Sequence, residues 1–293
     1  MQSQIQMRPR RSVLYMPGSN QRALEKARTL AADALILDLE DAVAPDQKPQ
    51  ARELVAAAVS AGGYGRRELV IRSNALSTPW GRDDLKMAAT ASVAAVCLPK
   101  VESAADVREA AQMLEALGAP AGMAIWVMIE TPLALLNVRE IAAAHPRLQV
   151  FVMGTSDLAK DLRVPHTPDR LGFQTAFGMA VLAARAFGLD VLDGVHLDLG
   201  GGDDYRAICE QGRALGFDGK TLIHPNQIAV ANEVFGPSAA SVEHAGRVIA
   251  AWDAAEKAGA GVAVLDGKLV ENLHAEEARR TLAIAEAIAQ RGQ

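Results

Sequence analysis

Short apolar segments alternate with longer amphipathic segments along most of the chain. The apolar segments are rich in Val, Ile and Leu and are almost continuously apolar, which is typical of strands that are covered on both faces of a sheet. We expect eight strands, at residues 13–16, 34–39, 69–72, 95–99, 123–129, 149–153, 191–195 and 221–223.

Helical periodicity marks the segments between these strands. The clearest helices are expected at residues 21–32, 49–60, 104–117, 132–144, 170–187 and 203–215. A helix between successive strands requires parallel pairing through right-handed crossovers. Polar residues follow many of the strands, and no GxGxxG turn follows the first one. The pattern therefore favours an α/β fold of the closed (β/α)8 TIM-barrel type over an open, dinucleotide-binding sheet.

The pattern changes after the eighth strand. Two helical segments enclose a short segment with the turn-forming pair Asp266–Gly267, which predicts a hairpin. We expect a catalytic barrel domain at 1–235 and a helix–hairpin–helix extension at 236–293. The extension is too small to fold alone, so we expect it to pack on the barrel or to reach a neighbouring subunit.

Composition narrows the classes of partner. The net charge is −5 and no basic stripe occurs, which argues against a nucleic-acid partner and favours a small molecule. Cys97 and Cys209 lie far apart in sequence, as expected for a reducing compartment. No run of about 18 apolar residues and no signal-peptide pattern occurs, so we expect no membrane association and a cytoplasmic location.

The carboxyl ends of barrel strands converge on one face, where Glu130 and Asp157 follow neighbouring strands. Adjacent strands lie about 4.8 Å apart, and two carboxylates that close repel unless a proton or cation lies between them. Oxygen ligands favour Mg²⁺, whereas the six histidines lack the spacing of a zinc site. The alternative is that both acids cap helices.

Arg72 stands in an apolar strand and therefore needs a carboxylate partner, either Glu40 or an anionic substrate. Asp38 and Glu40 face the same side of the second strand, and one of them could bond metal-bound water or orient an arginine, or both could be part of a helix cap. Lys100 could form a Schiff base, but pairing with Glu102 is the simpler interpretation.

A set of short segments resembles one known family in the expected order. They are RSVLYMPGSN (11–20), LILDLEDAV (35–43), VIRSN (70–74), CLPKVES (97–103), MIETP (128–132), GTSDLAKDL (154–162) and GFDGKTLIHPNQI (216–228). From about residue 10 to 275 the chain resembles the citrate lyase beta-subunit-like branch of the HpcH/HpaI aldolase superfamily, which includes malyl-CoA and citramalyl-CoA lyases.

The resemblance implies a barrel that binds Mg²⁺, for which Mn²⁺ can substitute, through Glu130 and Asp157. It implies that Arg72 holds the carboxylate of a 2-keto acid, and we expect Gly154 and Thr155 to contact substrate as well. It further implies a homotrimer or hexamer whose lid comes from a neighbouring subunit.

The implied reaction is carbon–carbon cleavage of a 3-hydroxyacyl-CoA thioester of the malyl-, citramalyl- or citryl-CoA type. The products are acetyl-CoA and a 2-keto acid, or the condensation runs in reverse. Family members usually carry an aspartate in the C-terminal hairpin, where GKLVENLH places Glu271. We therefore expect Glu271 to take the position of the catalytic aspartate of the lid. Its extra methylene group moves the carboxylate relative to that of an aspartate. Arg11 is a weaker candidate for a contact with coenzyme A.

Three alternatives stay open. The chain could be a citrate lyase beta subunit that acts on an acyl-carrier-protein thioester. It could be a class II 2-keto acid aldolase, but those relatives use a histidine near the second strand, and no histidine precedes His145 here. It could also be a non-catalytic ligand-binding barrel, which only Glu271 favours.

Overall fold

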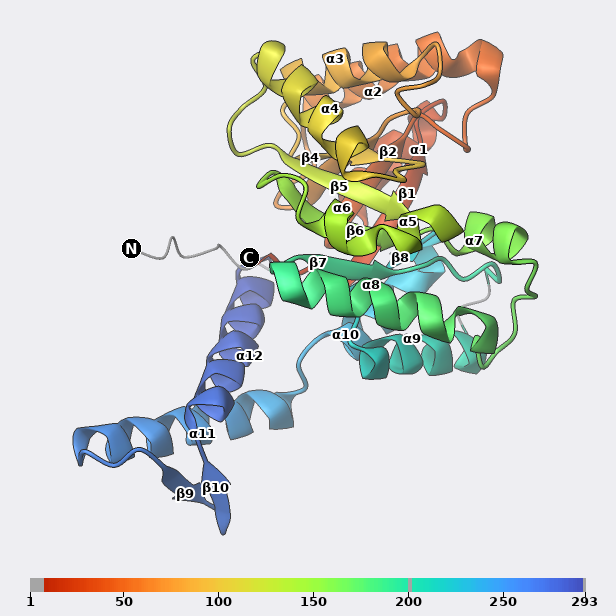
Figure 1. The fold of residues 1–293 in the computed structure, drawn as a ribbon. Helices are drawn as coiled ribbons and strands as arrows, with labels where there is room; N and C mark the ends of the chain where they lie inside the picture. The colour runs from red at the N-terminus through yellow and green to blue at the C-terminus, as the bar shows by residue number, and fades with distance from the viewer. Residues whose placement is uncertain (1–7, 200–201, 292–293) are drawn as a thin grey trace. The chain divides into compact units, whose positions relative to one another are not determined.

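Eight parallel strands pair in chain order and close into a barrel (Figure 1). The computed structural model describes residues 8–199 and 202–291. The strands are β1 (Ser12–Pro17), β2 (Ala34–Asp38), β3 (Glu68–Arg72), β4 (Ala95–Leu98), β5 (Ala124–Ile129), β6 (Leu148–Met153), β7 (Asp190–Asp193) and β8 (Gly219–Leu222). The predicted (β/α)8 barrel is confirmed, and each predicted strand overlaps one of these eight.

Helices connect the strands and surround the barrel. They are α1 (Gln21–Lys26), α2 (Lys48–Ala61), α3 (Gly81–Thr90), α4 (Ala104–Ala116), α5 (Pro132–Leu136), α6 (Val138–Ala142), α7 (Thr155–Leu162), α8 (Gln174–Phe187), α9 (Asp203–Leu215) and α10 (Ile228–Phe235). Short 3₁₀ turns lie at Ala27–Thr29, Pro45–Gln47, Leu171–Phe173 and Pro225–Gln227. None of the helices in the described part of the chain has the length and apolar character needed to span a membrane.

Two local predictions differ from the structure. The single helix expected at 132–144 is divided into α5 and α6 at Asn137, whose side-chain amide donates to the Glu102 carbonyl at 2.8 Å. Residues 155–162, which are not among the helices expected from the sequence, fold into α7.

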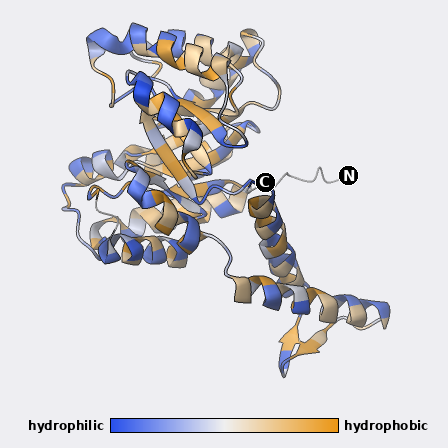
Figure 2. Cartoon of the chain, turned by 180° about the vertical axis from the view of Figure 1, so that it is seen from behind, coloured by the Kyte–Doolittle hydropathy of each residue, from blue (hydrophilic) through white to orange (hydrophobic). Residues whose placement is uncertain are grey.

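The side chains that fill the barrel are mostly small or β-branched. This core includes Ala34, Val70, Ala95 and Val150, and its large aromatic ring is that of Trp126, which has no exposed surface. The strands carry the hydrophobic colour in Figure 2, whereas hydrophilic and hydrophobic positions alternate along the outer helices. This is the pattern expected for a buried parallel sheet.

A buried ion pair closes the amino-terminal end of the barrel. The Arg10 guanidinium donates to both carboxylate oxygens of Glu68, at 2.7 and 2.9 Å, and lies 5.2 Å from the centroid of the Trp126 ring. A bidentate pair of this kind is both strong and directional. Ligand access to the interior is therefore left to the carboxyl ends of the strands.

Residues 233–291 form a second compact unit with its own apolar cluster. It contains α11 (Ala239–Lys257), the antiparallel hairpin of β9 (Ala263–Leu265) and β10 (Lys268–Val270), and α12 (Asn272–Arg291). Trp252 packs with Val248, Val270 and Ala275 in this cluster. The helix–hairpin–helix extension is therefore present.

Gly219→Ala tests how closely the barrel closes between β8 and the start of β1. A Cβ atom at Gly219 would lie 1.8 Å from the carbonyl oxygen of Arg10, so backbone must move. We expect a loss of about 3 kcal/mol or more in the free energy of unfolding, measured by urea denaturation.

Gly178→Ala is the matched control, because nothing lies within 4 Å of the added Cβ and the residue is inside α8. This variant should gain about 0.5–1 kcal/mol from helix propensity. Equal stability of the two variants would contradict the close approach at Gly219.

Candidate active site

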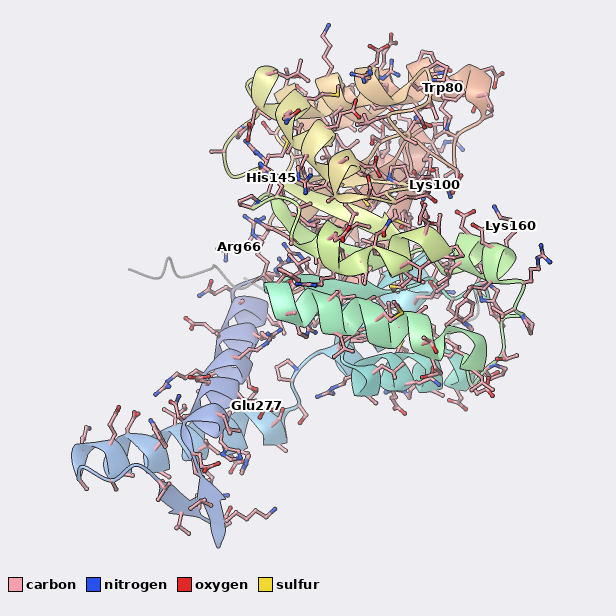
Figure 3. All side chains as sticks on the ribbon, viewed as in Figure 1. Arg66, Trp80, Lys100, His145, Lys160 and Glu277 are labelled. Carbon is pink, nitrogen blue, oxygen red and sulfur yellow. The ribbon has the colours of Figure 1, made fainter. Side chains whose placement is uncertain are left out.

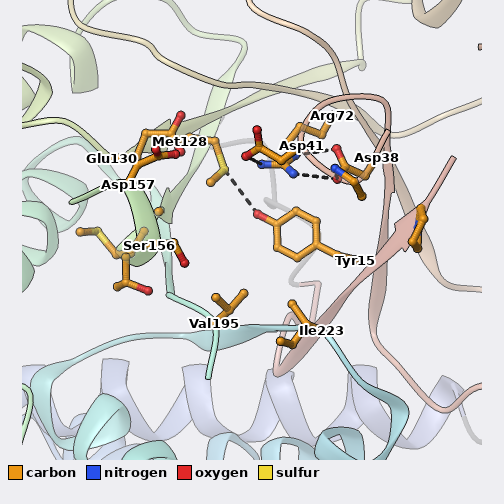
Figure 4. Close-up of a pocket in the computed structure, with 15 residues that line it drawn as sticks. Tyr15, Asp38, Asp41, Arg72, Met128, Glu130, Ser156, Asp157, Val195 and Ile223 are labelled. Carbon is orange, nitrogen blue, oxygen red and sulfur yellow. Dashed lines mark hydrogen bonds and ion pairs between the residues drawn. The ribbon is translucent and has the colours of Figure 1, made fainter. Parts of the chain in front are cut away.

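A cavity of about 390 Å³ opens at the carboxyl ends of the strands (Figure 4). Its lining joins charged side chains with an apolar wall: Tyr15, Pro17, Asp38, Asp41, Ala42, Arg72, Met128, Glu130, Met153, Gly154, Thr155, Ser156, Asp157, Val195 and Ile223. The chain thus gathers residues from the ends of seven strands, all except β4, into one pocket, as expected for a barrel enzyme.

Glu130 follows β5 and is 2% exposed. The backbone N–H of Lys100 donates to its Oε1 at 2.7 Å. On its other side the carboxylate meets Gly154, where an added Cβ would lie 2.5 Å from Glu130 Oε2. Glycine at 154 is therefore a steric requirement of the Glu130 conformation.

Asp157 lies in the first turn of α7 and not at the end of a strand. Lys100 Nζ makes a short ion pair with Asp157 Oδ2 and lies 3.4 Å from Glu130 Oε1. The two acids therefore face one cation-binding position, and they lie together in Figure 4. The expected pairing of Lys100 with Glu102 is wrong, because the Lys100 side chain points to these two acids instead.

Burial and charge act in opposite directions on the two acids. Burial raises the pKa of Glu130, and the attraction of Lys100 only partly offsets that increase. Burial would also raise the pKa of Asp157, but its hydrogen bond and charge interaction with Lys100 outweigh the effect and lower it. A buried carboxylate with an elevated pKa beside an ionised one gains stability from a nearby cation.

Arg72 lies at the end of β3, directly beside Asp38 of β2 in the strand register. Its Nε and one terminal nitrogen each donate to Asp38 at 2.7 Å, and the other terminal nitrogen pairs with Glu40 at 2.8 Å. The Tyr15 ring lies 4.9 Å from the guanidinium carbon. Because a guanidinium has five N–H donors, Arg72 keeps donors for an anion in the cavity.

The pKa of Glu40 is raised to about 8, mainly because the side chain is buried. Arg72 lowers it, but one guanidinium is shared by three acids, Asp38, Glu40 and Asp41. Asp41 therefore adds repulsion that Arg72 does not fully balance. The pKa of Glu40 therefore lies closer to neutral pH than that of an ordinary glutamate.

The amino end of α7 faces the same cavity. Gly154 is the N-cap residue and makes no side-chain capping bond, so the first N–H groups of the helix need other partners. The hydroxyl of Thr155 is buried without a hydrogen-bond partner among the described residues. Free N–H groups at a helix start favour an anion, such as a substrate carboxylate.

Glu130 and Asp157 are the candidate ligands of a divalent metal. Within the described ranges no group of three or more His, Cys, Asp and Glu side chains has metal-binding geometry. Glu130 and Asp157 instead offer two carboxylates that line the open cavity. That donor set fits Mg²⁺, which commonly keeps several waters and binds substrate oxygens through its remaining positions.

Arg72, Glu130, Gly154, Thr155 and Asp157 of the predicted site residues line the cavity, whereas Glu40 reaches it only through its ion pair with Arg72. Arg11 and Glu271 lie elsewhere. Arg11 precedes β1 at the opposite end of the barrel, where it forms an ion pair with Asp33 at 2.8 Å, so its predicted contact with coenzyme A is dropped. Glu271 belongs to the C-terminal unit, where it is exposed and its N–H donates to His274 Nδ1 at 3.0 Å.

Sequence reasoning missed three residues that line the cavity, Tyr15, Val195 and Ile223, and it named Glu40 and not Asp38 as the carboxylate partner of Arg72. Tyr15 faces inward from β1 and donates to Met128 Sδ at 3.4 Å, and Asp38 is the principal partner of Arg72. Val195 and Ile223 complete the apolar wall. The alternation of β1 could have indicated Tyr15, but the partner of Arg72 depends on strand register, which the sequence does not reveal.

Replacing Glu40 by Gln tests its raised pKa. The folded chain keeps the Glu40 proton up to about pH 8, whereas an unfolded glutamate releases it near ~4.3. The parent therefore loses stability as the pH rises through this interval, and Glu40→Gln does not. Urea denaturation at about pH 5 and about pH 9 should show the variant gaining stability relative to the parent at the higher pH. A pH-independent difference would contradict this assignment.

Comparison with known proteins agrees with the geometry. Residues 11–225 match the model of the HpcH/HpaI aldolase/citrate lyase family. A (3S)-malyl-CoA thioesterase from Cereibacter sphaeroides is 54% identical, with 97% of each chain covered. An L-malyl-CoA/beta-methylmalyl-CoA lyase from the same species is 36% identical, with 96% of each covered. The citrate lyase beta subunit of Escherichia coli is 35% identical over 97% of this chain and 95% of that protein.

Among solved structures, CitE from Mycobacterium tuberculosis in complex with magnesium, acetoacetate and coenzyme A is similar, with a TM-score of 0.73. It is 31% identical and covers 94% of this chain and 97% of that one. The chain therefore belongs to the HpcH/HpaI aldolase/citrate lyase family.

Proposed function

We propose that this chain is a Mg²⁺-dependent enzyme that acts on malyl-CoA and hydrolyses its thioester, releasing malate and free CoA. The observation that carries the reaction type is the 54% identity to a (3S)-malyl-CoA thioesterase over 97% of both chains. The cavity supports the substrate class, because one pocket joins a carboxylate pair suited to a metal with an arginine that keeps donors for an anion.

The metal would be held by Glu130 and Asp157, and Mn²⁺ could replace Mg²⁺. When bound, it supplies Lewis-acid polarisation of the substrate oxygens. Arg72 binds and orients the malyl carboxylate through donors that Asp38 leaves free, and Asp38 keeps the guanidinium in place. Gly154 and Thr155 present the start of α7 to the same anion.

Hydrolysis also requires a proton transfer. The oxygen of water attacks the thioester carbon, the carbon–sulfur bond breaks, and the proton that water loses ends on the leaving sulfur. We assign that transfer to Glu40, because it pairs at 2.8 Å with Arg72, which lines the cavity, and burial raises its pKa to about 8. The lid role of residues 236–293, with Glu271, and the homotrimer or hexamer stay predictions from the family resemblance.

Carbon–carbon cleavage of malyl-CoA to acetyl-CoA and glyoxylate is the second candidate. The 36% identity to the L-malyl-CoA/beta-methylmalyl-CoA lyase and the same acidic pair favour it. Both reactions need the metal and Arg72. They differ in whether water reaches the thioester carbon.

One product assay separates these reactions. Malyl-CoA is incubated with the protein and Mg²⁺, and the products are identified by liquid chromatography and mass spectrometry. We expect malate and free CoA in equal amounts, and loss of turnover with EDTA. Acetyl-CoA and glyoxylate would instead establish the lyase, and turnover that persists in EDTA would contradict the metal site.

The variant Glu130→Gln/Asp157→Asn should lower turnover by about 10³-fold or more, because the metal loses both carboxylate ligands. Glu102→Gln is the control, since Glu102 is close in sequence to Lys100 but its backbone N–H is bound to Asp106, outside the cavity. Near-parental turnover in the double variant would contradict the proposed function.

A further inference from the structure

Lys100 is the residue that links the two acids of the site. It follows β4, and its ammonium contacts Asp157 and lies 3.4 Å from Glu130 Oε1. The same Glu130 oxygen accepts the backbone N–H of Lys100 at 2.7 Å. One residue thus reaches both carboxylates, and it holds Glu130 from the backbone as well as from the side chain.

The backbone of Lys100 is in the left-handed region, with φ of +53°. This conformation costs a residue with a Cβ atom about 1–2 kcal/mol, so it persists only where the surroundings require it. Here it lets the N–H and the side chain of one residue point to the same side. The strained conformation therefore coincides with the contacts to Glu130 and Asp157.

The Lys100 side chain also has a second place to lie. It lines a neighbouring groove of about 240 Å³, together with Asp106 and Glu109. The side chain is 36% exposed and has a flexible, unbranched stem. Rotation about that stem can carry the ammonium from the two acids into this groove, where Glu109 is already paired with Arg82 at 2.6 Å.

The Lys100 ammonium lies against one oxygen of each acid, which is the position that a divalent ion bound by both acids needs. Mg²⁺ binds oxygen at about 2.0–2.1 Å, whereas a charged nitrogen donor stays at about 2.7–2.9 Å. The two acids carry a formal charge of −2, which one ammonium halves and a divalent ion neutralises. A divalent ion at Glu130 and Asp157 therefore requires the ammonium to leave.

We propose that Lys100 is an exchangeable counter-ion of the Glu130–Asp157 pair, which a divalent metal displaces into the neighbouring groove. This inference rests on the metal site of the proposed function. In the metal-free protein, Lys100 keeps the two acids charged and close together. Because it competes with the metal for this position, it also lowers the metal affinity. Its backbone N–H continues to position Glu130 after the exchange.

The test is calorimetric titration of the protein with Mn²⁺. Lys100→Met keeps an unbranched side chain and removes the competing charge, so we expect Mn²⁺ to bind about tenfold more tightly. Lys160→Met is the matched control, because Lys160 lies 3.4 Å from Asp157 Oδ1 but is 71% exposed (Figure 3). This control should change the affinity by less than about twofold.

A second readout follows the displaced amine in the unaltered protein. The protein is treated with a limiting amount of an amine-reactive acetylating reagent, and the modified lysines are mapped by mass spectrometry. Lys100 should be acetylated several-fold faster with saturating Mn²⁺ than without it. Lys268, which is exposed in the C-terminal unit, serves as the internal reference.

The outcomes separate this inference from the metal site itself. Unaltered or weaker Mn²⁺ binding by Lys100→Met, with normal binding by the parent, overturns the counter-ion role alone. The same holds if Mn²⁺ leaves Lys100 acetylation unchanged. Absence of Mn²⁺ binding by the parent overturns the metal site and this inference together.

Discussion

Repulsion between two carboxylates governs the open end of this barrel. Glu130 is almost fully buried and Asp157 lies close enough for one lysine to contact both. Without a cation their charges would drive them apart or force a proton onto one of them. The surrounding features follow from that constraint: the glycine at 154 that admits Glu130, the strained Lys100 backbone, and a short helix that carries Asp157 inward.

Other buried charges of the barrel are paired with one another. At the amino-terminal end Arg10 pairs with Glu68 beside Trp126, and Asp193, the last residue of β7, accepts from Arg170 and from Lys220 of β8. Buried charges of this kind are tolerated because each finds its partners. Polar chemistry with spare donors, as on Arg72, is confined to the carboxyl ends.

The sequence was sufficient to predict the barrel, because eight apolar segments separated by amphipathic ones permit few other folds. It also indicated Glu130 and Arg72, which stand at strand ends, and Asp157, which lies in the first turn of α7. It did not reveal that Asp38 holds Arg72, because that contact follows from the register between β2 and β3. The direction of the Lys100 side chain depends on a left-handed backbone that no local pattern encodes.

The most direct test of this account is anomalous diffraction from crystals of the protein soaked with Mn²⁺ and malate. The account predicts one strong anomalous peak with Glu130 and Asp157 as its protein ligands, at about 2.2 Å, and a malate carboxylate facing Arg72. A cavity that holds malate while the anomalous signal lies elsewhere, with Lys100 still bound to both acids, would contradict it.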